Sequence, residues 1–343
     1  MCCIFRPRFW AATATLGLAG LFLAFPDAAA AGFAQGVHLC LDTLLPSLFP
    51  FFIACGFVSS SVGKKGGFFA ALLLSWLGGY AVCAGLVRDL RAREKVGPEQ
   101  ATLLLLLGCC SGPGFVIGSI GGHLLRSVPI GIALYTAQLF ANLVCTALLW
   151  PLIKRGAFRT ENTAKTNVQI AVAQGLPQAI TQAVDSCLCV CGTVLFFRMA
   201  QCVLCSAFSL SSITGTFLSA FLEISSGCAD FAALGGTVAL YGLCLCLSGL
   251  GASVFVQLQA LLNGAASLRA LVCCRLLHIP VMAVLTGWGL RFLPGESAVF
   301  SSLAPRVIAM SRTTPDTAFV VFLFLCAVLY KMRKKNYNKA IRV

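Results

Sequence analysis

Leu106-Leu107-Gly108-Cys109-Cys110-Ser111-Gly112-Pro113-Gly114 interrupts an apolar segment with small residues and a proline. A second apolar segment carries a similar interruption, Leu245-Cys246-Leu247-Ser248-Gly249-Leu250-Gly251. Each Ser-Gly-x-Gly is followed by a short apolar segment and then by a longer one. Interrupted apolar segments at corresponding places in two halves indicate a solute site near the bilayer midplane. The pattern predicts a membrane protein that handles a small solute or signal.

Composition supports this class. The chain has 343 residues, of which 59% are hydrophobic and 10% charged, and its mean hydropathy is +0.91. A soluble domain carries about 25% charged residues, and eleven acidic residues could not solvate a water-exposed surface of this size. We expect an all-α polytopic integral membrane protein in contact with the lipid bilayer.

The formal net charge is +14, but the basic residues gather at the ends of apolar segments. Membrane proteins fix their orientation in this way, because cytoplasmic loops keep Lys and Arg. No aromatic-basic platform accompanies the charge, so nucleic-acid binding is not expected. The clusters include Arg6 and Arg8, Lys64 and Lys65, Arg88 to Lys95, Lys154 to Arg159, and Lys331 to Lys339.

The 19 cysteines are scattered through apolar runs, and the three histidines are far apart in sequence. Free cysteine packs as a small hydrophobe, whereas a zinc site needs ligands at close, regular spacing. We therefore expect neither a metal nor another cofactor.

The chain divides into five parts by composition. Residues 1–34 match either a first transmembrane helix, which we prefer, or a cleavable signal peptide. A first repeat (35–153), a polar linker (154–168) and a second repeat (169–293) follow. Residues 294–343 are expected to hold a last transmembrane helix and a basic tail.

When residues 111–114 are placed on 248–251, the arms that follow them align without a gap. Upstream the connecting segments differ in length, and there Gly79 is matched with Gly227. Each repeat is expected to contain a bent first helix, a broken helix, a re-entrant hairpin at the Ser-Gly tip, and a spanning helix. The alternative is a chance alignment of leucine-rich segments. Residues 88–95 hold four basic residues, whereas 229–240 hold none and include Asp230. If basic loops stay inside, the repeats are inverted, as in many secondary transporters.

Four stretches resemble the Gate-domain, or nucleoside-recognition, membrane proteins, and within them the YlbJ-type sporulation integral membrane proteins. They are Leu45 to Phe52, Gly78-Gly79-Tyr80, Ser111 to Phe115, and Glu223 to Gly227 with Ser248-Gly249 downstream. The resemblance covers roughly residues 8–332. It implies a multi-pass protein in the cytoplasmic membrane of a spore-forming bacterium, in the forespore or mother-cell membrane, with a role in spore-coat or cortex assembly. The family often has a proline after Gly-Tyr, where this chain has Ala81.

The candidate solute-binding residues lie at the predicted breaks. A non-helical tip inside a membrane is tolerated where it is buried in protein or lines a wet cavity, and helix ends there direct partial charges into that cavity. The alternative is that the glycines only permit close helix packing, and that Tyr80 only packs. The candidates are Gly79, Tyr80, Ser111, Gly112, Pro113, Gly114, Glu223, Ser225, Gly227, Ser248, Gly249 and Gly251.

Several charged residues lie inside apolar sequence. Glu223 is costly in lipid, so it is expected to face a cavity, bind a cation or carry a proton. The alternative is a salt bridge with Arg198 or Arg275. Asp42 and Asp185 are expected to cap the helices that follow them.

The leading function is a transporter-like or permease-like protein for an unidentified small polar solute during spore formation. The alternative is a non-transporting scaffold that organises spore-envelope proteins. No catalytic motif occurs, so an enzyme is not expected. A membrane enzyme would need a paired acid and base, which Glu223 beside His123 or His278 would supply.

Overall fold

The computed structural model describes residues 7–46, 48–53, 67–156 and 176–292. It confirms an all-α polytopic protein: the described residues contain no strand, and five helical stretches are long and apolar enough to cross a membrane. These are Phe68–Ala92, Val128–Lys154, Leu176–Ala207, Gly236–Leu262 and Leu268–Gly289. Most of the predicted polar linker and all of residues 294–343 lie outside the described residues.

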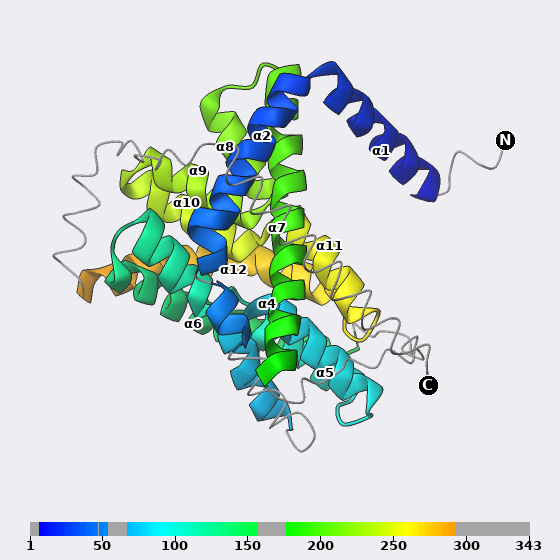
Figure 1. Ribbon diagram of the computed structural model, residues 1–343. Helices are drawn as coiled ribbons and strands as arrows, with labels where there is room; N and C mark the ends of the chain where they lie inside the picture. Colours follow the sequence, from blue (N-terminus) through cyan, green and yellow to red (C-terminus); the bar gives the residue numbers. More distant parts are fainter. Residues whose placement is uncertain (1–6, 47, 54–66, 157–175, 293–343) are drawn as a thin grey trace.

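Helices make up most of the described residues in both halves (Figure 1). The first half contains α1 (Pro7–Ala24), α2 (Pro26–His38), the π-helical η1 (Leu39–Leu44), α4 (Phe68–Ala92), α5 (Pro98–Gly108), the π-helical η2 (Gly114–Leu124) and α6 (Val128–Lys154). The second half contains α7 (Leu176–Ala207), α8 (Ser212–Leu222), α9 (Ile224–Leu234), α10 (Gly236–Gly249), α11 (Gly251–Leu262), α12 (Leu268–Gly289) and the short η3 (Leu290–Phe292).

The N-terminal segment is two helices at a steep angle. The chain bends by 100° between Ala24 and Pro26, and Figure 1 shows α1 projecting away from the bundle. Pro26 starts α2, a position where a proline is well tolerated because the first amides of a helix have no intrahelical partner. The boundary predicted between residues 34 and 35 therefore falls inside α2.

Helices α2 and α7 lie side by side and run antiparallel (Figure 1). A Cβ on Gly32 would lie 2.8 Å from the Cα of Met199, and one on Gly36 would lie 3.0 Å from Leu195 Cδ2. Further along, the Cys40 thiol reaches the Cys191 carbonyl. Small residues at such contacts let two helix backbones approach closely.

The chain folds back between α8 and α9. The rings of Phe217 and Phe231 lie 5.3 Å apart, whereas fourteen residues along a straight helix would span about 21 Å. A Cβ on Gly227 would lie only 2.4 Å from the Cα of Ala220. Glu223, in extended conformation between the helices, forms the tip of this second hairpin.

Although Phe68–Ala92 has the length and composition of a membrane span, α4 is interrupted at Gly79 and folds back there. A Cβ on Gly108 would lie 2.8 Å from Ser75 Cβ and 3.0 Å from Cys83 Sγ. A straight helix would place residues 75 and 83 about 12 Å apart along its axis. Gly79 has φ 79° and ψ −170°, a conformation open to glycine. Its position marks the tip of the first hairpin.

These two hairpins correct the predicted architecture. The second Ser-Gly stretch was expected to be a re-entrant hairpin, but α10 and α11 follow one another as a single 27-residue span. The reason lies in the break residues: Gly79 and Glu223 are extended and redirect the chain, while Leu250 takes a compact left-handed conformation, with φ 65° and ψ −21°. The hairpins lie at Gly79 and Glu223, and Leu250 interrupts a helix that continues.

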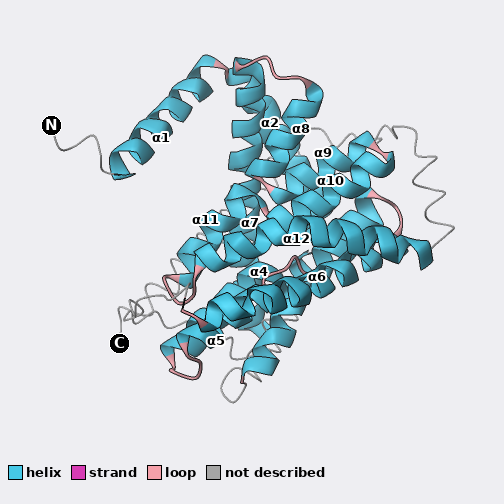
Figure 2. Cartoon of the chain, turned by 180° about the vertical axis from the view of Figure 1, so that it is seen from behind, coloured by secondary structure: helices cyan, strands magenta, loops and turns pink. Residues whose placement is uncertain are grey.

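Helices at corresponding places in the two halves run antiparallel. In α6 and α12, Asn142 contacts Arg275 while Gln138 contacts His278, and α2 and α7 are antiparallel as well. Helix α5 lies at the opposite end of the molecule from α9 and α10 in both views (Figures 1 and 2). Inverted repeats would produce this arrangement, although the duplication itself stays a prediction.

The sidedness of two loops tests the inversion. We expect cysteines introduced at Ala92 and Ala233, both exposed, to be labelled from opposite faces of the membrane by an impermeant thiol reagent. The background would lack the accessible native cysteines. Labelling of both sites from one face would contradict inverted halves.

Gly227 and Gly249 allow a test of close helix packing, because only Gly227 lies against a neighbouring backbone. Gly227→Ala should lower the free energy of unfolding by about 1–3 kcal/mol, because its Cβ would overlap the backbone of Ala220. Gly249→Ala is the matched control: nothing lies within 4 Å of its Cβ, so stability should stay unchanged or rise by up to about 1 kcal/mol. Thermal unfolding in lipid nanodiscs measures both, and equal losses would refute the packing role of Gly227.

Candidate solute site

Three breaks in regular helix converge on one small cavity of about 40 Å³. The first hairpin tip, the unwound segment between α5 and η2 and the second hairpin tip all reach it, with Val190 of α7 and residues 48–52 completing the wall. Six of the twelve predicted site residues line it: Gly79, Tyr80, Ser111, Gly112, Gly114 and Ser225. The structure therefore brings together half of the predicted set, from elements far apart in sequence.

Gly79 and Gly112 let the first tip touch the unwound segment. A Cβ on Gly79 would lie 3.0 Å from the Gly112 amide nitrogen, and one on Gly112 would lie 3.1 Å from the Leu77 carbonyl. Any side chain at either position would force the two backbones apart and open this wall of the cavity.

The other predicted residues lie away from the cavity lining. Gly251 contacts the second tip, with its Cβ position 3.2 Å from the Glu223 Cα. Pro113 precedes η2, Gly227 packs against Ala220, and Gly249 faces open space. Ser248 is buried against α12. In each half, then, a hairpin tip touches the break of the helix that follows it.

Glu223 is buried and serves as a helix cap. Its Oε2 accepts a hydrogen bond from the Ser226 amide at 2.7 Å, which satisfies a free donor at the start of α9. The alternative of a salt bridge is wrong among the described residues. Arg198 instead holds Asp230 with a bidentate pair, Nη2 to Oδ1 being 2.8 Å.

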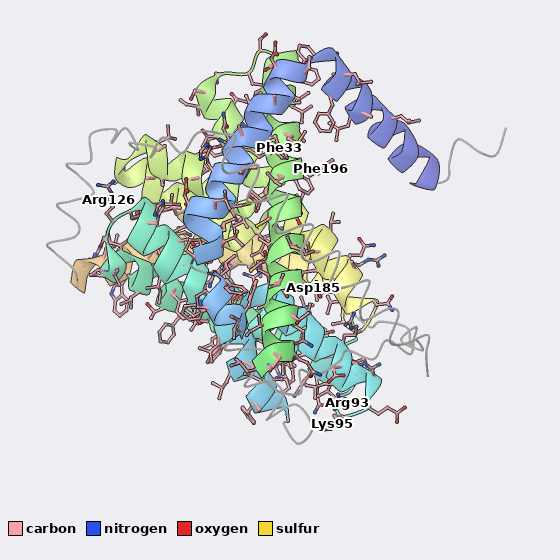
Figure 3. All side chains as sticks on the ribbon, viewed as in Figure 1. Phe33, Arg93, Lys95, Arg126, Asp185 and Phe196 are labelled. Atoms are coloured by element: carbon pink, nitrogen blue, oxygen red, sulfur yellow. The ribbon has the colours of Figure 1, made fainter. Side chains whose placement is uncertain are left out.

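The predicted caps at Asp42 and Asp185 are also wrong. Asp42 lies within η1, 3.5 Å from the His38 Nδ1, and Asp185 lies within α7 (Figure 3). In both places the helix begins before the aspartate, in sequence that is less apolar than the run after it. Neither aspartate is therefore at a helix start.

Polar side chains of α6 complete the hydrogen bonding of the first break. Gln138 accepts from the Ser111 amide at 3.3 Å and donates to the Ser111 carbonyl at 3.0 Å, as a neighbouring backbone strand would. Asn142 donates to the carbonyls of Leu107 and Cys109. Both are fully buried, and neither was predicted as a site residue from the sequence. An amide pair four residues apart in an apolar span was the available signal.

His278 connects the two breaks. Its Nδ1 lies 2.8 Å from Ser248 Oγ, and its Nε2 lies 3.2 Å from the Gln138 carbonyl. A carbonyl only accepts, so Nε2 carries the proton, and in the neutral ring Nδ1 accepts from the serine hydroxyl. These contacts place His278 between α6 and α10, with Ser248 and Gln138 as its partners and not Glu223.

Arg275 is the most deeply buried charge at the first break. Only 2% of it is exposed, and its Nη2 donates to the Cys109 carbonyl and to Asn142 Oδ1. Its Nε and Nη1 are buried without a hydrogen-bond partner. Within the described ranges, no group of three or more His, Cys, Asp or Glu side chains could hold a metal ion.

No protein-family model, curated protein or solved structure matches the chain. The resemblance to the Gate-domain proteins therefore stays a prediction from the four sequence stretches.

The cap at Glu223 makes a testable contribution to stability. Glu223→Ala should lower the free energy of unfolding by about 1–2 kcal/mol, because the Ser226 amide loses its acceptor. Glu223→Gln keeps an acceptor oxygen and should cost clearly less. Thermal unfolding compares the two, and equal losses would show that the charge and not the hydrogen bond is what α9 requires.

Proposed function

We propose that the protein is a transporter-like or permease-like membrane protein that binds a small polar solute in the cavity between the two hairpin tips and the first broken helix. The convergence of three helix breaks on one cavity carries this proposal. In hydrocarbon, non-helical backbone is tolerated where it is packed in protein or lines a cavity, and transporters build midplane sites from such breaks.

The size of the cavity indicates a closed conformation. About 40 Å³ has room for about three water molecules, whereas sites for small molecules usually enclose about 300–1,000 Å³. A solute can enter only if a hairpin tip moves away from the unwound segment. The contact between Gly79 and Gly112 is one that such a movement would break.

Ser111, which lines the cavity, has a buried hydroxyl that the fold leaves unused. Ser111 is 1% exposed, its amide and carbonyl are bound by Gln138, and its Oγ has no partner. A buried hydroxyl without a partner costs about 1–3 kcal/mol, a cost that a bound solute would offset.

The role in spore formation rests on the sequence resemblance, as does the cytoplasmic membrane of a spore-forming bacterium as its location. The rival function, a scaffold for spore-envelope proteins, agrees with the tightly closed cavity, since a scaffold needs no solute. The two functions differ in what a solute does to the folded protein.

Ser111→Ala and Ser253→Ala form a matched pair. Both serines are 1% exposed and have unpaired hydroxyls, but only Ser111 lines the cavity. Neither substitution should lower the melting temperature. In a panel of nucleosides, sugars, amino acids and short carboxylates, a solute that stabilises wild type should stabilise Ser253→Ala equally and Ser111→Ala at least about tenfold more weakly in Kd.

Two results would contradict the proposal. One is that no solute in the panel stabilises the wild-type protein, which would favour the scaffold. The other is that a stabilising solute binds Ser111→Ala as tightly as wild type, which would place the solute elsewhere.

A further inference from the structure

The carbonyl end of α5 is buried at the first break and carries partial negative charge. A helix of this kind ends with unpaired carbonyls equivalent to about half an elementary charge. Here Leu107 and Cys109 supply such carbonyls; Cys109 is fully buried and Leu107 is partly buried. In broken-helix transporters, unwound carbonyls and half-helix C-termini are where Na⁺ or H⁺ is coordinated. The question is what neutralises this end in the present chain.

The donors at these carbonyls come from three different helices. Trp76 Nε1 donates to Leu107 at 3.0 Å, and Asn142 Nδ2 donates to both carbonyls at 3.3 and 3.4 Å. Arg275 donates to Cys109 and is held in turn by Asn142 Oδ1 at 3.1 Å. Of these three side chains only Arg275 brings a full positive charge.

Arg275 has no acidic partner among the described residues. Ion pairs there join Asp89 to Arg93, Arg198 to Asp230 and His38 to Asp42. A buried cation without a carboxylate is costly unless other groups stabilise it. The carbonyl end of α5 is such a group, and it explains why an arginine is tolerated here.

We propose that Arg275 is the built-in cation of the first break, so that this break needs no free Na⁺ or K⁺. Its guanidinium takes the carbonyl contact that a coupling ion would otherwise make. The inference deepens the proposed function, because it concerns the same broken helix, but its test needs no solute.

The test is the cation dependence of thermal unfolding of the full chain in lipid nanodiscs. Melting temperatures are compared in NaCl, KCl and choline chloride at equal ionic strength. Wild type should melt at the same temperature in all three. Arg275→Ala should melt about 5 °C lower or more in choline, and Na⁺, K⁺ or added methylguanidinium should recover part of that loss.

Arg269→Ala is the matched control, because it removes an exposed positive charge from the same helix. It should show no cation dependence. Na⁺ or K⁺ stabilisation of wild type, an undiminished melting temperature of Arg275→Ala, or a loss that none of the small cations relieves would each overturn the proposal.

A second pair covers the case in which Arg275→Ala does not fold. Arg275→Lys keeps the charge and should remain independent of Na⁺ and K⁺, whereas Arg275→Gln should become dependent on them. Equal behaviour of these two variants would overturn the proposal.

Because this test adds no solute, a failure here would be distinct from a failure of solute binding.

Discussion

The fold depends on pairing the backbone groups that residues 109–112 expose when the helix stops between α5 and η2. In hydrocarbon each unpaired amide or carbonyl costs several kcal/mol. Gln138 and Asn142 supply the missing partners from α6. The neighbouring helix α6 therefore supplies the hydrogen bonds that the break cannot make within itself. These bonds hold the non-helical segment in place beside the cavity.

The breaks in the two halves differ in chemistry. At the first break, Asn142 and Arg275 donate to backbone carbonyls, and the buried hydroxyl of Ser111 has no partner. At the second break, Leu250 continues the hydrogen bonding of α10 through its own amide, which donates to Cys246, and Ser248 is taken up by His278. The cavity is consequently lined by the first break and by both hairpin tips. This asymmetry gives the first half most of the residues that line the cavity.

The sequence was sufficient for the class of protein and for the position of the breaks. Small residues and proline mark where a helix stops, and both Ser-Gly stretches do interrupt helices. Composition does not determine the direction of the chain after a break. Hairpins were therefore predicted at the Ser-Gly stretches, whereas the structure has them at Gly79 and Glu223. The roles of Gln138 and Asn142 could not be predicted, because they depend on which segment packs beside α6 in the folded protein. For Arg275 an acid was expected, but its partner is a carbonyl 166 residues away.

That separation has a consequence for how the molecule is made. Ribosomes deliver the first broken helix to the membrane long before α12 has been synthesised. Until then the Cys109 carbonyl has Asn142 of α6 as its donor but lacks the charged contact with Arg275. The first half consequently reaches its final form only when the last described span inserts beside it. The last stage of folding therefore joins the two halves. A chain that stops before residue 275 would lack the contact between Arg275 and the Cys109 carbonyl.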